Sequence, residues 1–411
     1  MNIAVAQSGG PTCAINASLL GVIKEAFRHS EIKNVYGSIN GIEGIINDEL
    51  VDLKSYFHSN EDMELLRQTP STVLGSCRYK LPLVEEDENI YKKITECFLK
   101  YNIKAFFYIG GNDSMDTANK LSKYFKEKDI DISVIGVPKT IDNDLCETDH
   151  TPGFGSAAKY VATSIQEITR DSYVYSVNSI TIIEVMGRHA GWLAAASAIL
   201  HANGESSPHL IYLPEADFSL EQFFDDIEEQ LKLHKAVVVV VSEGIDLSKS
   251  GVNYTSGKVD NFGHKYLSGV GKYLEKLVAE HFSVKVRSIE LNVMQRCSSH
   301  ISSKTDIKEA EEIGAEAVKT ALSGQSGKMM RFRRVLDMPY TVVIEPVDAE
   351  LVANKEKFFP KNWLNDKQNN IKEEALKYFL PLIEGEQNLK MKNGMPVHFK
   401  VFNPQESNYK K

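Results

Sequence analysis

The residues most able to do chemistry stand in one short run, Gly136 to Asp144. An apolar segment before it, Asp131 to Val137, predicts a buried strand that stops at a proline. A cation, a hydroxyl and two carboxylates then follow at once, on Lys139, Thr140, Asp142 and Asp144. In an open α/β sheet, ligands bind at the carboxyl ends of the strands. These groups at that place predict a site that handles a phosphate and its metal ion.

Two glycine loops follow other predicted strands. Gly110-Gly111-Asn112-Asp113-Ser114 comes after one strand, and Gln7-Ser8-Gly9-Gly10-Pro11 comes after the first strand of the chain. Glycine lets the backbone approach a ligand, and Ser114 or Asp113 could cap a helix whose N-terminus favours an anion. Alone, each loop is more often a plain strand-to-helix turn, and the Gly9 loop lacks the lysine of a Walker A loop. Together with Lys139, the two loops favour a phosphate site.

A third glycine motif, Gly153-Phe154-Gly155-Ser156-Ala157-Ala158, matches the dinucleotide-binding pattern on paper. That pattern requires a strand immediately before it. The preceding residues, Cys146 to Thr151, do not form a strand pattern. We therefore interpret the motif as the start of a helix, and a nicotinamide dehydrogenase is a remote alternative.

Charged side chains also stand near the ends of later predicted strands. Arg188 follows the strand Ile180–Val185, and Arg296 follows a strand predicted to begin just after Arg287. Arginine binds phosphate through a bidentate fork, so these three arginines could form an anion clamp. Glu243, just past another strand, could accept hydrogen bonds from hydroxyl groups. The alternative for each is an ordinary solvated charge.

The elements that must position these loops alternate between strand and helix. Strands are predicted at Ile3–Gln7, Ala105–Ile109, Val134–Val137, Ile180–Val185, Leu210–Leu213, Ala236–Val241 and Ser288–Val293. Helices are predicted near Ala14–His29, Ser114–Lys126, Ser156–Arg170, His189–Leu200, Leu220–Leu233, Leu267–Glu280 and Ile307–Leu322. Such alternation predicts an α/β fold with parallel sheets covered on both faces. There are too many units for one small sheet, so we expect two lobes with a cleft between them.

The bulk properties narrow the class of protein. The 411 residues carry a formal net charge of -9, which argues against a general nucleic-acid binder. Five scattered cysteines without a CxxC pair predict a reduced compartment, and we expect a cytoplasmic protein. No apolar window approaches the length of a membrane span, so no membrane partner is expected.

In combination, these motifs resemble the phosphofructokinase family. The resemblance covers roughly the first three quarters of the chain in several separated motifs. They are the Ser8-Gly9-Gly10 loop, Val73 to Tyr79, the Gly110-Gly111 loop, the Lys139 run, Met186-Gly187-Arg188, Glu243, Arg287 and Gln295-Arg296. The resemblance implies an α/β protein of two Rossmann-like lobes with mostly parallel sheets. It also implies phosphoryl transfer to the 1-hydroxyl of fructose 6-phosphate.

The resemblance assigns the catalytic groups to the Lys139 run. It implies that Asp142 is the general base and that Thr140 lies beside the transferring phosphoryl group. Mg²⁺ is the implied cofactor, with Asp144 and Asp113 as its expected ligands. Asn112, however, replaces an aspartate that is common at the metal site of relatives.

The resemblance also assigns the groups that hold the two substrates. Met186, Gly187 and Arg188 match the sugar-phosphate motif, Glu243 matches an acceptor of a sugar hydroxyl, and Arg296 matches a ligand of the 6-phosphate. Arg78 matches an arginine that contacts the transferred phosphate, and Gly10 is expected to bind substrate. Arg287 matches an arginine that a neighbouring subunit supplies, which implies a homodimer or a larger homo-oligomer. Val293 stands where many relatives have a histidine near the sugar phosphate, and Ser179 stands where bacterial ATP-dependent enzymes have an arginine from the adjacent subunit.

Two positions bear on the phosphoryl donor. Asp113 stands where ATP users commonly have glycine, and it adds bulk and negative charge where a nucleotide's α-phosphate would lie. Lys139 also replaces a glycine, and it can balance the charge of a free terminal phosphate. Both resemble the diphosphate-dependent branch. We therefore expect a reversible, diphosphate-dependent phosphofructokinase, with an ATP-dependent enzyme or a catalytically silent sugar-phosphate-binding subunit as alternatives.

The expected organisation has three parts. Residues 1–140 are predicted to form a phosphoryl-donor lobe, to which the chain returns at about 300–335. Residues 141–299 are predicted to form a fructose 6-phosphate lobe. Residues 345–411, which are rich in Lys, Asn and Glu, are predicted to form a C-terminal appendage.

Overall fold

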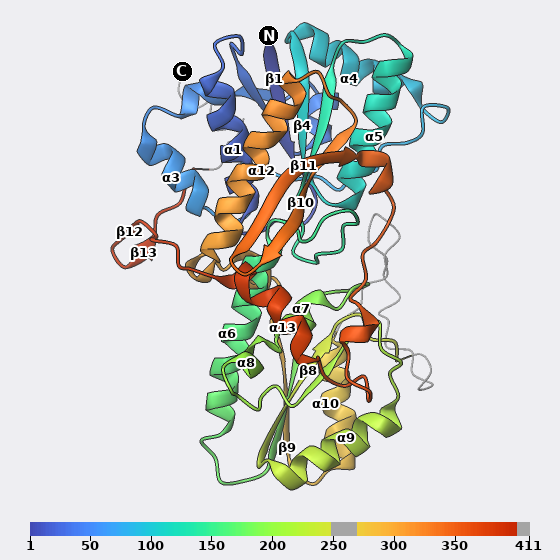
Figure 1. The fold of residues 1–411 in the computed structure, drawn as a ribbon, viewed down its shortest axis with the longest axis vertical. Coiled ribbons are helices and arrows are strands. Elements are labelled where there is room, and N and C mark those ends of the chain that lie inside the picture. Colours follow the sequence, from blue (N-terminus) through green and yellow to red (C-terminus); the bar gives the residue numbers. More distant parts are fainter. Residues whose placement is uncertain (248–268, 401–411) are drawn as a thin grey trace.

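The computed structural model describes residues 1–247 and 269–400, and it has two lobes stacked along the long axis of the molecule (Figure 1). The first lobe is built on a seven-stranded sheet with the order β11-β10-β5-β4-β1-β2-β3. Its strands are β1 (Asn2–Gln7), β2 (Val35–Ser38), β3 (Leu50–Asp52), β4 (Ile103–Gly110), β5 (Ser133–Pro138), β10 (Lys328–Asp337) and β11 (Tyr340–Asp348). The chain leaves this sheet after β5 and returns to it through β10.

The three central strands of this sheet place the predicted loops side by side. β1 pairs in parallel with β4, with Gln7 opposite Ile109, and β4 pairs in parallel with β5, with Gly110 opposite Pro138. The Gly9 loop, the Gly111 loop and Lys139 therefore leave the same edge of the sheet. The expected phosphate site lies at this edge because all three strands are parallel and end in register.

The second lobe contains a four-stranded parallel sheet with the order β7-β8-β6-β9. Its strands are β6 (Ser179–Val185), β7 (Leu210–Tyr212), β8 (Ala236–Ser242) and β9 (Lys285–Glu290). Val185 lies opposite Ser242 at the carboxyl ends of β6 and β8. Met186 and Glu243, which come next along the chain, are thereby brought together.

Helices cover the two sheets. Those of the first lobe are α1 (Ile15–Arg28), α2 (Ile42–Ile46), α3 (Asn60–Gln68), α4 (Glu88–Lys100), α5 (Asn112–Glu127) and α12 (Lys304–Leu322). Those of the second lobe are α6 (Phe154–Ser172), α7 (Trp192–Ala196), α8 (Ile199–Ala202), α9 (Leu220–Leu233), α10 (Val270–His281) and α11 (Met294–Cys297). α12 packs along α1 beside the first sheet (Figure 1). No helix among the described residues is long and apolar enough to cross a membrane.

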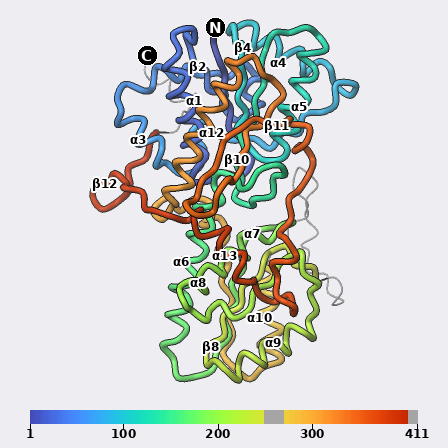
Figure 2. Tube along the Cα trace, viewed as in Figure 1, coloured from blue at the N-terminus to red at the C-terminus, as the bar shows by residue number. Residues whose placement is uncertain are grey.

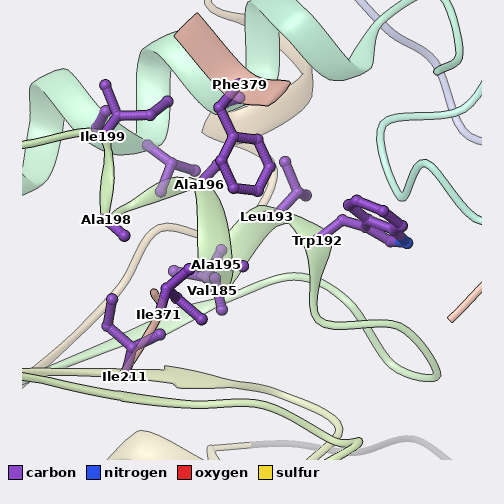
Figure 3. Packing of buried hydrophobic residues seen from close by; sticks show 14 of the residues in the cluster. Val185, Trp192, Leu193, Ala195, Ala196, Ala198, Ile199, Ile211, Ile371 and Phe379 are labelled. Atoms are coloured by element: carbon purple, nitrogen blue, oxygen red, sulfur yellow. The ribbon is translucent and has the colours of Figure 1, made fainter. Parts of the chain in front are cut away.

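The last part of the chain runs along both lobes. After β11 it descends from the first lobe to the second, forms α13 (Glu373–Phe379) and then rises to a small hairpin of β12 (Met391–Lys392) and β13 (Met395–Pro396), as Figure 2 shows. Phe379 and Ile371 lie in the core of the second lobe with residues of α7 and α8 (Figure 3). This segment is therefore an integral part of the fold that spans the lobes. The first residues of the segment expected as an appendage, up to Asp348, belong to the β11 strand of the large sheet.

Three predicted elements were wrong in their bounds. The strand expected at Ser288–Val293 is Lys285–Glu290, so Arg287 lies inside it. The single helix expected at His189–Leu200 is two short helices, α7 and α8, because the loop around Arg188 extends to Gly191. The helix expected from Leu267 begins at Val270, and Leu267 itself lies outside the described residues.

Candidate active site

Lys139 connects the three loops at the edge of the large sheet. Its backbone N donates to Gly110 O at 2.9 Å, and its Nζ donates to Gly10 O at 2.7 Å. The side chain is only 2% exposed. Burial lowers the pKa of Lys139 to about 8, although the nearby charges of Asp142 and Asp144 oppose that shift. A buried cation thus stands beside two carboxylates, which is an arrangement suited to an anionic ligand.

Asp142 and Thr140 form a local turn next to this lysine. The Asp142 backbone N donates to Thr140 Oγ1 at 3.1 Å, and Thr140 Oγ1 donates to Asp142 Oδ2 at 3.4 Å. Burial raises the pKa of Asp142, while the Thr140 hydroxyl and the charges of Lys139 and Arg296 oppose the shift. A carboxylate with a raised pKa is a better proton acceptor, as a general base requires.

Asp144 has the electrostatic character of a cation ligand. Burial raises its pKa to about 7, and the charge of Asp142 adds to this shift. A divalent cation would relieve the repulsion between the two carboxylates, so the residues present fit Mg²⁺. Within residues 1–247 and 269–400, no group of three or more His, Cys, Asp or Glu side chains is arranged to hold a metal. The protein would therefore supply few of the ligands of the ion, and substrate oxygens and water would supply the rest.

The start of α5 differs from the sequence-based expectation. Gly111 occupies the N-cap position without a side-chain cap, so the prediction that Ser114 or Asp113 caps the helix was wrong. Asp113 is exposed in the first turn, where the helix dipole favours a carboxylate. Asn112 binds the C-terminal segment, since its Nδ2 donates to Lys355 O and its Oδ1 accepts from Asn354 N, both at 2.6 Å. Its amide is thus engaged away from any metal.

The loops of the second lobe hold the residues expected to bind the sugar phosphate. The Met186 backbone N donates to Gln295 Oε1 at 3.1 Å, and the Gly187 backbone N lies 3.4 Å from Glu243 Oε1. Gly187 has a φ of 130°, a conformation that favours glycine. Burial raises the pKa of Glu243, and the negative charge of Asp142 adds to the shift.

Arg296 lies close enough to Asp142, and Arg188 close enough to Glu243, for their charges to act on those carboxyls. Arg188 Nε is buried without a hydrogen-bond partner, which is unusual for a guanidinium nitrogen and leaves a donor for a ligand. Arg296 reaches across to the first lobe, where its Nη1 lies 3.3 Å from the position that a Cβ on Gly10 would occupy. A side chain at position 10 would therefore crowd Arg296. Both lobes contribute positive charge to the same site.

Arg287 lies apart from these two arginines. Arg287 donates to Thr181 Oγ1, Asp171 Oδ2 and Ser172 Oγ, within 3.2 Å, inside β9 and away from the carboxyl ends of the strands. The prediction of a clamp that joins Arg188, Arg287 and Arg296 within one chain was therefore wrong. Arg78 is exposed and follows Cys77, whose carbonyl accepts from Gly9 N at 3.2 Å. It therefore lies beside the Gly9 loop.

Sequence reasoning missed the contribution of the C-terminal segment to this site. Glu356 Oε1 lies 2.6 Å from His189 Nδ1, and Lys357 contacts the loop that follows Asp142. The one available signal was a lysine next to the aromatic cluster Phe358-Phe359. That signal does not distinguish Lys357 from neighbouring lysines, because the contact joins residues more than 200 positions apart.

Comparisons with known proteins agree with this geometry. The model of the family described as phosphofructokinase matches residues 2–321. The pyrophosphate–fructose 6-phosphate 1-phosphotransferase of Halomonas elongata is 40% identical over 398 residues, which are 96% of this chain and 94% of the relative. The enzyme of the same name from Xanthomonas campestris is 41% identical over 406 residues, 98% of this chain and 96% of the relative. The crystal structure of a pyrophosphate-dependent phosphofructokinase from Marinobacter aquaeolei is similar, with a TM-score of 0.86, 37% identity, and coverage of 97% of this chain and 96% of that one.

Proposed function

Because this chain belongs to the phosphofructokinase family, we propose that it transfers a phosphoryl group from diphosphate to fructose 6-phosphate. The products are fructose 1,6-bisphosphate and phosphate. The observation that carries the choice of donor is the ammonium of Lys139, buried against Gly10 O and beside Asp142. A buried cation there stabilises the compact charge of diphosphate, and relatives named for this donor match nearly the whole chain.

The site residues divide the work as follows. Asp142 accepts the proton of the sugar 1-hydroxyl as that oxygen attacks phosphorus, and the released phosphate departs on the far side. Lys139 and Thr140 lie beside the transferring group, and the phosphate is contacted by Gly10 in the Gly9 loop and by Arg78 beside that loop. Asp144 and Asp113 would hold Mg²⁺, which would supply positive charge to the phosphate groups.

The sugar phosphate binds between the lobes. Arg188 and Arg296 bind the sugar phosphate from the second lobe, and the unpartnered Arg188 Nε supports this role. Glu243 accepts a hydrogen bond from a sugar hydroxyl, with Met186 and Gly187 shaping the loop beside it. In this scheme residues 1–140, with the return at about 300–335, bind the donor, and residues 141–299 bind the sugar phosphate.

A donor comparison tests the activity. The purified chain is assayed with Mg²⁺ and fructose 6-phosphate, with either diphosphate or ATP as the donor. We expect turnover with diphosphate and little with ATP. Turnover with ATP alone would instead establish an ATP-dependent enzyme. Binding of fructose 6-phosphate without turnover of either donor would favour a silent regulatory subunit.

A second copy of the chain completes the site in this proposal. Four large apolar side chains are exposed just before β6, with Tyr173 43%, Val174 70%, Tyr175 51% and Val177 58% exposed. They adjoin Asp171 and Ser172, to which Arg287 binds. An exposed apolar patch beside an arginine that does not face its own cleft supports an isologous homodimer.

Mixing two inactive variants tests this arrangement. D142N removes the base, and R287M removes the arginine expected in trans. In a mixed dimer of the two variants, one of the two sites has both an intact Asp142 and an intact Arg287. A mixture of the two variants should therefore recover activity that neither has alone. A mixture that stays as inactive as its components, in a protein shown to exchange subunits, would place Arg287 outside the site.

A further inference from the structure

The side chain of Asn143 is held from both ends by the C-terminal segment. Asn143 lies between Asp142 and Asp144, is fully buried and has a φ of 55°. Its Nδ2 donates to Tyr378 Oη at 2.7 Å, and its Oδ1 accepts from Lys357 Nζ at 3.3 Å. A non-glycine residue with positive φ is held there by its surroundings, since this conformation is sparsely populated.

Lys357 fastens the rest of the same loop. Its Nζ also donates to Thr148 O at 3.1 Å and to Asp149 O at 2.8 Å. Its backbone N donates to Asp144 O at 2.7 Å. The ammonium lies 5.0 Å from the centroid of the Trp192 ring, within range of a cation–π contact. One lysine thus satisfies acceptors at both ends of the 143–149 loop.

The segment that carries Lys357 is itself anchored at two places. Upstream, Asn354 Nδ2 donates to Asp116 Oδ1 at 2.9 Å, and the Asn354 backbone N donates to Asn112 on the first turn of α5. Downstream, Phe379 and Ile371 are buried in the core of the second lobe (Figure 3). These anchors fix the position of Lys357 relative to both lobes.

We propose that Lys357 is a positioning residue for phosphoryl transfer, which acts with Tyr378 through Asn143 to set the directions of the Asp142 and Asp144 carboxylates. The inference rests on the proposed function, because those carboxylates are the base and the metal ligand of that reaction. Neither Lys357 nor Tyr378 needs to touch a substrate. Their loss should therefore reduce kcat and leave the KM for fructose 6-phosphate nearly unchanged.

The experiment compares three single variants with the parent dimer. K357M removes the ammonium and keeps most of the volume, and Y378F removes only the hydroxyl, which accepts from Asn143 Nδ2 and donates to Asp149 O. K377M makes the same change as K357M at an exposed lysine of α13 and is the matched control. Hydrogen–deuterium exchange of the peptide that covers residues 140–150 is measured beside the kinetics, so the loop is followed independently of turnover.

We expect K357M to lower kcat about 100-fold, in keeping with a small misplacement of catalytic groups. The 140–150 peptide should exchange about tenfold faster as the loop opens more often. Y378F should show a smaller loss of the same kind, and K377M should match the parent. If K357M does not fold, kcat and the exchange of the 140–150 peptide are measured on Y378F and K357R instead.

The outcomes separate this inference from the proposed function. An inactive parent would refute the proposed function, whereas unchanged exchange of the 140–150 peptide in folded K357M would overturn the inference, whatever the activity. Faster exchange with parental kcat would also overturn it, because the loop would then not limit the reaction. In the double variant K357M/Y378F, the losses should be less than multiplicative, since both residues bind the same two partners, the Asn143 side chain and Asp149 O. Fully multiplicative losses would overturn the shared route through Asn143.

Discussion

In the proposed scheme, the donor side and the sugar side of the site differ in how far a single chain completes them. On the donor side, Lys139 is buried and already bonded to Gly10 O, and Asp142 and Thr140 are bonded to each other. On the sugar side, the buried Arg188 Nε has no partner and Arg287 binds away from the cleft. The proposed donor half is therefore preformed, whereas the proposed sugar half has a buried donor, Arg188 Nε, that a ligand can satisfy.

The largest effect is expected where the two halves meet, at Asp142. D142N keeps the shape of the side chain but cannot accept the proton of the attacking hydroxyl. We expect kcat to fall about 10³-fold, with the KM for both substrates within a few-fold of the parent. Steady-state kinetics with diphosphate measure this, and D225N, at an exposed aspartate of α9, is the control. A loss confined to KM would assign Asp142 to binding and remove the base from the proposed mechanism.

The preformed donor half should be specific for its donor. In D113G/K139G, the charge and bulk that disfavour a nucleotide are removed together with the cation that binds diphosphate and with one of the two carboxylates proposed to hold Mg²⁺. We expect kcat/KM for diphosphate to fall about 100-fold and activity with ATP to rise above the parent's. The single variant D113N removes the negative charge of this side chain and keeps its size, so it separates the effect of charge from that of bulk. Diphosphate kinetics equal to the parent's would show that these two positions do not select the donor.

A substitution in the sugar half should mainly weaken the binding of fructose 6-phosphate. R188M removes the guanidinium whose Nε has no partner, so the sugar phosphate loses charge-assisted hydrogen bonds but the base is untouched. We expect the KM for fructose 6-phosphate to rise about 50-fold, with kcat within a few-fold of the parent's. R28M, at an arginine whose side chain is 71% exposed, is the control. An equal fall in kcat would instead make Arg188 part of transition-state stabilisation, and the two halves would then not separate.

The sequence predicts the donor half better than the sugar half for a physical reason. Lys139, Thr140, Asp142 and Asp144 lie in one run after a buried strand, so local pattern alone places them together. The sugar half depends on strand ends that are distant in sequence. The prediction began β9 three residues too late, at Ser288. It therefore placed Arg287 just outside the strand, whereas the structure has Arg287 inside it.

The elements that the sequence did not reveal depend on tertiary contacts. The hairpin of β10 and β11 was not predicted, because β10 carries Arg331, Arg333 and Arg334 and its outer half is exposed. Such a strand lacks the apolar run that marks the buried strands β5 and β8. The bonds from Asn112 to the C-terminal segment likewise have no local signal. They also explain why an asparagine serves at a position where an aspartate was expected, since its Nδ2 donates to a carbonyl and a carboxylate could not.

The smallest effect, a pH dependence, should again belong to the donor half. Burial lowers the pKa of Lys139 to about 8, so the free enzyme loses this positive charge as the pH rises through that value. We expect kcat/KM for diphosphate to fall about tenfold per pH unit above pH 8, because the neutral amine no longer attracts the anion. K139R, whose guanidinium stays charged, should remove this alkaline limb even if its activity at pH 7 is lower. The affinity for fructose 6-phosphate should not share the limb, because Lys139 is not among the residues proposed to bind the sugar phosphate. A limb that persists in K139R would mean that another group titrates there, and the buried ammonium would then not be what attracts the donor.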